Sequence, residues 1–399
     1  MGSVLDIDAL LDDPQTRVIV CCGAGGVGKT TVAAALGVRA AESGRRVVVL
    51  TIDPARRLAQ SLGLTTLDNT PRPVQNIDDA RGGSLDAMML DMKRTFDEVV
   101  MAHAAPDKAE QILANPFYQA VSSSFAGTQE YMAMEKLGQL RLEADRNPEH
   151  PRWDLIVVDT PPSRSALDFL DAPKRLGSFL DGRFIRILAA PAKVGGRAYL
   201  KVFTTGVNIV TTAMTKLLGG QMLTDVQTFV AALDTMFGGF RERADHTYAL
   251  LSDSATKFIV VAAPERDALR EAAYFVDRLD EEGMPLAGLV VNRVYRVSAP
   301  GLSAARALSA AEELDDVEND SSSNGGSSGS SGVSESTAIT QALLRLHAVQ
   351  AEIAGRHQSL AKRFIAGHPD IPTVEVPAAS QDIHDLVGLR AVGEALAGQ

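Results

Sequence analysis

The fold is decided by residues 23–31, which read GAGGVGKTT. The segment contains the spacing G-x-x-x-x-G-K-T, formed by Gly23, Gly28, Lys29 and Thr30. An apolar run, RVIVCC, precedes it, and a helical pattern, TVAAALGVRAAES, follows it. Glycines let backbone N–H groups wrap a phosphate chain, and a helix N-terminus adds positive partial charge. In this strand–loop–helix context, the spacing predicts a phosphate-binding loop rather than an empty glycine-rich turn.

On both sides of this loop, short apolar runs alternate with helical patterns along the chain. Such nearly continuous apolar runs are typical of strands buried on both faces of a parallel sheet. The sequence therefore predicts an α/β fold, with a mostly parallel sheet flanked by helices and an inserted helical subdomain. The predicted strands lie at 17–22, 46–51, 155–159, 257–263, 286–292 and 373–377.

The uneven spacing of these runs predicts the domain organisation. Roughly a hundred residues separate the second run from the third, and a similar stretch separates the third from the fourth, so we expect helical insertions. Between Arg306 and Arg345 there is no Lys or Arg, and 13 of the 16 residues at 321–336 are Ser or Gly. We expect a core at 1–85, 150–172, 255–310 and 337–399, insertions at 86–149 and 173–254, and a flexible acidic Ser/Gly linker at 311–336.

The loop and the strand ends supply the candidate binding residues. Lys29 is expected to reach the β- and γ-phosphates, and the Thr30 hydroxyl to bind Mg²⁺. Asp159 follows four apolar residues at a strand end, so we expect it to hold Mg²⁺ as well. Asp53 lies at another strand end, where ligands bind in open α/β sheets, although it could simply cap the next helix. The expected nucleotide contacts in the loop are Gly25, Gly26, Val27, Gly28, Lys29, Thr30 and Thr31.

These motifs resemble a known family. GxGGVGKTT, TIDPARR (51–57), DTPPS (159–163), the segment ending at Asn292 and VPAASQDIHDLVGLR (376–390) are similar, in the same order, to the arsenical pump-driving and tail-anchored-protein targeting ATPases. Those are P-loop ATPases that dimerise face to face in a nucleotide-dependent way. The resemblance implies an enzyme, a cytoplasmic Mg²⁺-dependent ATPase whose dimer closes on ATP and reopens on hydrolysis.

The resemblance also assigns roles to single residues. It makes Asp53 the residue that orients and deprotonates the attacking water. It makes Asn292 a contact to adenine, and Pro377 a residue that closes over the base. GTP is disfavoured because Tyr295 stands where a GTPase carries the aspartate that reads guanine.

One position departs from the family pattern. The relatives usually carry a second lysine after the first glycine, which reaches the partner's nucleotide, whereas this chain has Ala24. We therefore favour a heterodimer with a paralogue that carries the lysine over a homodimer. Arg56, Arg57 or Arg164 could supply the missing charge, although exposed arginines in ordinary salt bridges are common.

Composition narrows the other options. The chain has 399 residues, a net charge of −11 and two adjacent cysteines, Cys21 and Cys22. Because both cysteines lie on one predicted strand, we expect this chain to lack the zinc clamp, the arsenite site and the iron–sulfur cluster that related ATPases bind through cysteines. No nucleic-acid motif is evident, and an acidic N-terminus does not read as a signal peptide, so we expect a cytoplasmic protein.

The client remains open at this stage. Nine of the eleven methionines lie between 88 and 236, which fits either an adaptable apolar groove or ordinary core packing. We expect ATP hydrolysis coupled to delivery of a hydrophobic client, or to anion transport through a membrane protein. The alternatives are a catalytically weak regulatory subunit of a heterodimer and a partitioning-type positioning ATPase.

Overall fold

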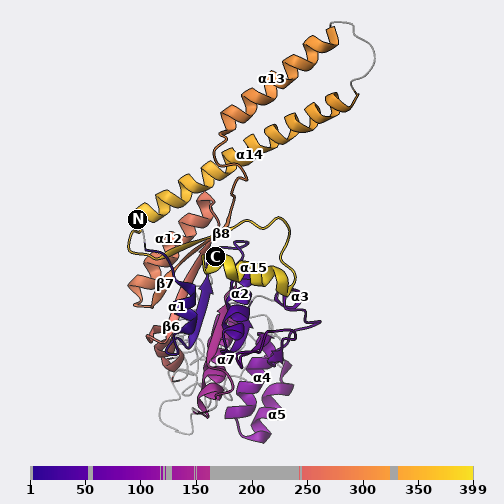
Figure 1. The fold of residues 1–399 in the computed structure, drawn as a ribbon. Helices are drawn as coiled ribbons and strands as arrows, with labels where there is room; N and C mark the ends of the chain where they lie inside the picture. The colour runs from indigo at the N-terminus through magenta and orange to yellow at the C-terminus, as the bar shows by residue number, and fades with distance from the viewer. Residues whose placement is uncertain are drawn as a thin grey trace, which may run out of the picture.

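Eight strands form one sheet in the computed structural model, in the order β3-β4-β2-β5-β1-β6-β7-β8 (Figure 1). Within the described ranges, β3 and β4 pair antiparallel and every other neighbouring pair is parallel. The structure describes residues 3–52, 57–116, 118–119, 122, 128–147, 149, 151–161, 242, 245–323 and 331–398. The strands are β1 (Val18–Cys22), β2 (Arg46–Thr51), β3 (Arg72–Pro73), β4 (Ser84–Met89), β5 (Leu155–Asp159), β6 (Thr256–Ala262), β7 (Leu286–Val294) and β8 (Thr373–Pro377).

The six predicted strands are confirmed as β1, β2, β5, β6, β7 and β8. Their apolar runs are continuous because helices cover both faces of the sheet. In β1, Val20 and Cys22 join one hydrophobic core, while Ile19 and Cys21 join the other. Successive side chains of a strand point to opposite faces, so one apolar run serves both cores.

The helices form the two outer layers. Residues of α1, α2 and α15 contribute to the core on one face, and residues of α4, α5, α7, α12 and α14 to the core on the other. The helices are α1 (Ile7–Asp12), α2 (Lys29–Glu42), α3 (Arg57–Ser61), α4 (Met92–His103), α5 (Pro106–Ala114), α7 (Thr128–Asp145), α12 (Arg266–Glu281), α13 (Ala304–Ser323), α14 (Ser331–Gly367) and α15 (Leu386–Leu396). This three-layer arrangement confirms the predicted α/β class.

β3 and β4, which were not predicted from the sequence, extend the sheet beyond β2. The expected helical insertion at 86–149 therefore begins within a strand, since β4 runs to Met89. An aspartate in the middle of β4 obscured the apolar pattern. Asp86 accepts a hydrogen bond from Nε1 of Trp153, a fully buried side chain, at 2.9 Å. The hydrogen bond from Trp153 gives the Asp86 carboxylate a partner, so an aspartate can lie within this strand. The local sequence does not reveal that partner, so the segment was not predicted as a strand.

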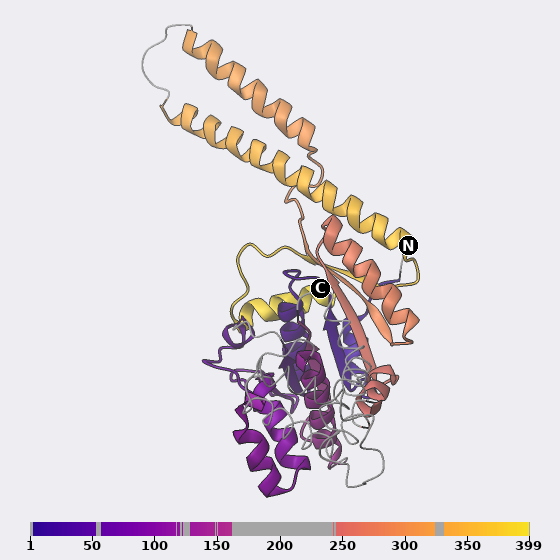
Figure 2. The same cartoon turned by 180° about the vertical axis from the view of Figure 1, so that it is seen from behind.

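The predicted linker at 311–336 also differs from the structure. Helix α13 continues to Ser323 and α14 begins at Ser331, and residues 324–330 lie outside the described part. The two helices lie side by side and project from the body of the protein (Figures 1 and 2). Across the pair, Gln341 Nε2 donates to Asp315 Oδ1 at 2.9 Å, and Arg345 forms an ion pair with the same carboxylate.

Helices of membrane-spanning length and hydropathy are not found in the part of the chain that the structure describes.

Candidate functional site

The phosphate-binding loop connects β1 to α2 at the carboxyl edge of the sheet. Gly23, Gly26 and Gly28 have φ values of 147°, 75° and 96°, which side chains other than glycine rarely adopt. Gly28 is the N-cap residue of α2, so the first N–H groups of the helix face the loop. Gly25 and Gly26 are exposed at the tip of the loop, where a phosphate chain would be reached.

Lys29 is folded back over the loop. Its Nζ donates to the carbonyl oxygens of Gly23 and Ala24 at 3.0 and 2.8 Å, and the residue is 6% exposed. The ammonium group is therefore held within the ring of backbone that the loop forms. A buried cation so placed favours an anion above the loop.

Asp159 lies beneath the loop, at the end of β5. Its side chain is fully buried, and its Oδ2 accepts from the hydroxyl of Thr30 at 2.7 Å and from that of Thr51 at 2.8 Å. The register places Asp159 opposite Cys21 on β1 and Thr51 on β2. Hydroxyl and carboxylate oxygens are hard ligands of the kind that Mg²⁺ prefers, so these residues fit a magnesium ion bound with a nucleotide phosphate.

Thr51 is a residue of this site that the sequence pattern did not predict. It was visible as a polar residue closing an apolar strand, one step before Ile52. Its bond to Asp159 depends on β2 and β5 being neighbours, which the local pattern does not report. Thr160, next to Asp159, likewise donates its hydroxyl to the carbonyl of Cys21 at 2.9 Å, which ties the end of β5 to β1.

Asn292 connects the far half of the sheet to the loop. Its Nδ2 donates to the carbonyl oxygen of Val27 at 2.8 Å, and the residue is 7% exposed. A Cβ on Gly28 would come within 2.3 Å of that same Nδ2. The structure thus brings the predicted adenine contact to the loop itself. Pro377 ends β8 and pairs in register with Val294, two residues beyond Asn292.

The remaining predicted residues divide into two groups. Thr31 is half-buried in the first turn of α2, and Ala24 is buried, with its carbonyl bound to Lys29. Asp53, Arg56, Arg164 and the side chain of Arg57 lie outside the described residues.

The methionines that the structure describes serve mainly as core residues. Met88 lies in β4 rather than in an inserted helix, and Met132 and Met134 in α7 are at most 1% exposed. All three belong to one hydrophobic core. Core packing therefore accounts for these methionines, while Met214, Met222 and Met236 lie outside the described residues.

Both thiols are buried where β1 enters the loop. Burial raises the pKa of Cys22 to about 12, and burial followed by the nearby Asp159 carboxylate raises the pKa of Cys21. The Cys22 thiol contacts the carbonyl oxygen of Ile259 on β6 at 3.7 Å. Protonated, enclosed thiols are poor nucleophiles.

We therefore expect neither cysteine to react with a disulfide reagent at pH 8 in the folded protein, and both to react after denaturation. When the pH rises above the usual thiol pKa of 9.0, the folded protein keeps both thiols protonated, whereas the unfolded chain loses these protons. Stability should consequently fall as pH rises above about 9. Rapid labelling of either thiol in native protein would contradict this description of β1.

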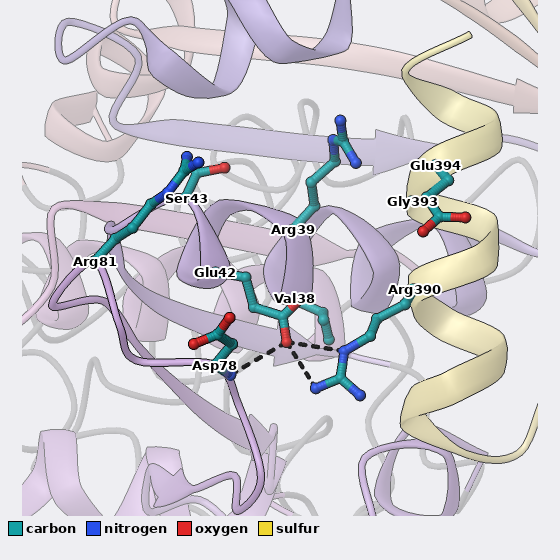
Figure 3. Close-up of a pocket in the computed structure, with 9 residues that line it drawn as sticks. All are labelled: Val38, Arg39, Glu42, Ser43, Asp78, Arg81, Arg390, Gly393 and Glu394. Carbon is teal, nitrogen blue, oxygen red and sulfur yellow. Dashed lines mark hydrogen bonds and ion pairs between the residues drawn. The ribbon is translucent and has the colours of Figure 1, made fainter. Parts of the chain in front are cut away.

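A cavity of about 310 Å³ lies at the other end of α2, against α15 (Figure 3). There Arg390 donates through Nε and Nη2 to Oε1 of Glu42 at 2.9 and 2.7 Å, and the backbone N–H of Asp78 donates to the same oxygen at 3.3 Å. Its lining charges balance, with Arg39, Arg81 and Arg390 against Glu42, Asp78 and Glu394. The charged residues that line the cavity therefore form an ion network at the surface, remote from the phosphate-binding loop.

The sequence matches known proteins over much of its length. A family model described as "Anion-transporting ATPase" matches residues 16–319. The chain is 25% identical over 289 residues to ATPase GET3C of Arabidopsis thaliana, a match that covers 70% of this chain and 67% of that protein.

Two prokaryotic proteins match over shorter stretches. ATPase BagA of Mycobacterium tuberculosis is 29% identical over 173 residues, which cover 42% of this chain and 48% of BagA. A putative arsenical pump-driving ATPase of Halobacterium salinarum is 29% identical over 198 residues, which cover 48% of this chain and 29% of that protein. The chain thus spans less than half the length of these two relatives.

Proposed function

The chain belongs to the anion-transporting ATPase family, and from that premise we propose that it hydrolyses ATP with Mg²⁺ to close and reopen a dimer. Its family and its likeness to ATPase GET3C support ATPase activity. The observation that carries the proposal is the grouping of Lys29, Thr30 and Asp159 around one glycine-rich loop.

Each of these residues has a separate task in phosphoryl transfer, which depends on positioning and charge stabilisation. The ammonium group of Lys29 binds the β- and γ-phosphates, and the loop N–H groups hold the rest of the phosphate chain. Thr30 and Asp159 would hold Mg²⁺, which would neutralise phosphate charge. Asn292 and Pro377 bind the base, and Asp53 orients and deprotonates the attacking water.

The dimer is proposed to be a heterodimer. Ala24 stands where the family resemblance would place the lysine that crosses to the partner's nucleotide, so a second protomer with that lysine would complete the site of this chain. The same alanine favours one alternative, in which this chain is a catalytically weak regulatory subunit. The family description supports coupling of hydrolysis to anion transport, and the likeness to ATPase GET3C is compatible with delivery of a hydrophobic client.

An Asp53→Asn variant tests the proposed hydrolysis. The amide cannot accept the proton of the attacking water, so we expect kcat to fall by about 100-fold or more, with ATP affinity retained. Turnover is measured on the chain alone and together with a paralogue that carries the lysine. Asp12→Asn, an exposed aspartate in α1, is the matched control and should leave turnover unchanged. If the complex with the paralogue kept its turnover when this chain carried Asp53→Asn, that result would support the regulatory-subunit alternative and contradict the role proposed for Asp53.

Light scattering of the unmodified protein tests the dimer separately. We expect ATP to produce a stable dimer only when the paralogue is present. A lone chain that dimerises on ATP and hydrolyses it rapidly would rule out the heterodimer.

A further inference from the structure

The α13–α14 hairpin is a built and anchored element. At its base, Ala361 and Phe364 of α14 join the core on the α12 face of the sheet. His347 Nε2 lies 2.8 Å from the carbonyl oxygen of Leu302, where the chain enters α13. Between the two helices, Ala311 and Ala348 are buried, at 0% and 2% exposure. The two helices therefore pack against each other from a fixed base.

The outer face of α14 carries an uncovered apolar stripe. Four large aliphatic side chains are more than half exposed: Ile339 at 58%, Leu343 at 60%, Leu346 at 53% and Val349 at 56%. Their spacing of four, three and three residues places them on one side of the helix. We call these four residues the α14 stripe. With a rise of 1.5 Å per residue it spans about 15 Å, or roughly three turns.

The α14 stripe lies in an acidic setting. Residues 307–344 contain seven acidic residues and no Lys or Arg, and the one arginine within the span of the stripe, Arg345, is paired with Asp315. Asp315 contacts Gln341 and Arg345, so its exposed neighbours on α13 lie at the level of the stripe. Those exposed carboxylates are Glu312, Glu313 and Asp316, and Glu335 precedes the stripe on α14.

From this combination we propose that the hairpin docks a basic amphipathic helix of another protein, which packs along the α14 stripe as a third helix. Apolar anchors at helical spacing are the way in which one helix recognises another. The surrounding carboxylates select lysines and arginines on the flanks of the incoming helix, which raises the association rate and excludes acidic helices.

Charge argues against the other occupants. A second copy aligned in parallel would set the carboxylates of one hairpin against those of the other. An anionic lipid surface attracts amphipathic helices with basic flanks, whereas residues 307–344 supply only acidic ones and the arginine that follows, Arg345, is paired with Asp315.

The test uses a synthetic labelled helix of about 20 residues, with leucines at i, i+3, i+4 and i+7 spacing and lysines on both flanks. We expect it to bind the full-length protein, and to bind more weakly as salt is raised. The double variant Leu343→Gln and Leu346→Gln should weaken binding by about 10-fold or more, because two leucines lose their apolar contact. Charge reversal by Glu312→Lys and Glu335→Lys should weaken it as well, because Glu335 lies one turn before Ile339 on the same side of α14.

Control variants distinguish binding at the α14 stripe from non-specific hydrophobic binding. Leu142→Gln removes an equally exposed leucine, at 58% exposure on α7, and should leave binding unchanged. All variants should keep the wild-type melting temperature and ATP turnover, since the stripe is remote from Lys29.

The proposal would be overturned if the double glutamine variant bound the peptide as tightly as the wild type, or if a peptide with glutamates in place of the lysines bound equally well. It would also be overturned if the protein self-associated through Leu343 in the absence of peptide, or if it bound phosphatidylserine vesicles in a way that depends on Leu343 and Leu346.

Discussion

Lys29→Ala is expected to lower ATP turnover by about 100-fold or more and to weaken ATP binding. The ammonium group is held inside the phosphate-binding loop by the carbonyl oxygens of Gly23 and Ala24. It is therefore already placed where phosphate charge would arrive, in a setting largely shielded from water. Removing it takes away a preorganised charge that water replaces poorly.

The measurement combines steady-state turnover with titration calorimetry of ATP binding. Lys29→Arg should also be impaired, because a planar guanidinium does not fit the space occupied by an ammonium. Lys362→Ala, at an exposed position on α14, is the matched control and should behave like the wild type. If Lys29→Ala hydrolysed ATP at a rate close to that of the wild type, the loop would not be the site of hydrolysis.

The sequence predicts the central strands well because each is buried on both faces. A run such as LIVVD in β5 needs no knowledge of its neighbours to be recognised, and it ends on the aspartate that the site uses. β4 was missed because its central Asp86 is satisfied by Trp153, which is 67 residues away. β3 contains only two residues, one of them Pro73, so no local pattern marks it.

The candidate site shows the same division. Lys29 and Thr30 follow directly from the spacing of the loop. The bond from Thr51 to Asp159 requires the order β2-β5-β1, and the bond from Asn292 to Val27 spans 265 residues. Local composition indicates which residues have suitable chemistry, whereas the strand order determines which of them meet.

The hairpin shows where composition misleads. The serines and glycines at 321–336 predict a linker, yet α13 runs through 311–323 and α14 includes 331–336. Nearer the base of the hairpin, Asp315 of α13 pairs with Arg345 and accepts a hydrogen bond from Gln341, and these contacts stabilise both helices. Tertiary pairing of this kind overrides weak local propensity.

Gly23→Ala should destabilise the protein severely, by about 3 kcal/mol or more. A Cβ at this position would lie 2.0 Å from the carbonyl oxygen of Val261, a backbone atom near the carboxyl end of β6. Neither partner can move away easily, because β1 and β6 are paired in register up to Cys22 and Val260, the residues directly before the contact. The φ of 147° adds further strain. The substitution therefore separates β1 from β6 at the point where the loop begins.

Gly26→Ala provides the matched control within the same loop. Its φ of 75° is also positive but lies near the left-handed helical region, and a Cβ there meets nothing within 4 Å. We expect this variant to lose only about 1 kcal/mol. The two variants are compared by urea denaturation without nucleotide, so that stability is read independently of ATP binding. Equal losses in the two variants would mean that φ strain alone accounts for the glycines, and that the close contact between Gly23 and β6 does not set the position of the loop.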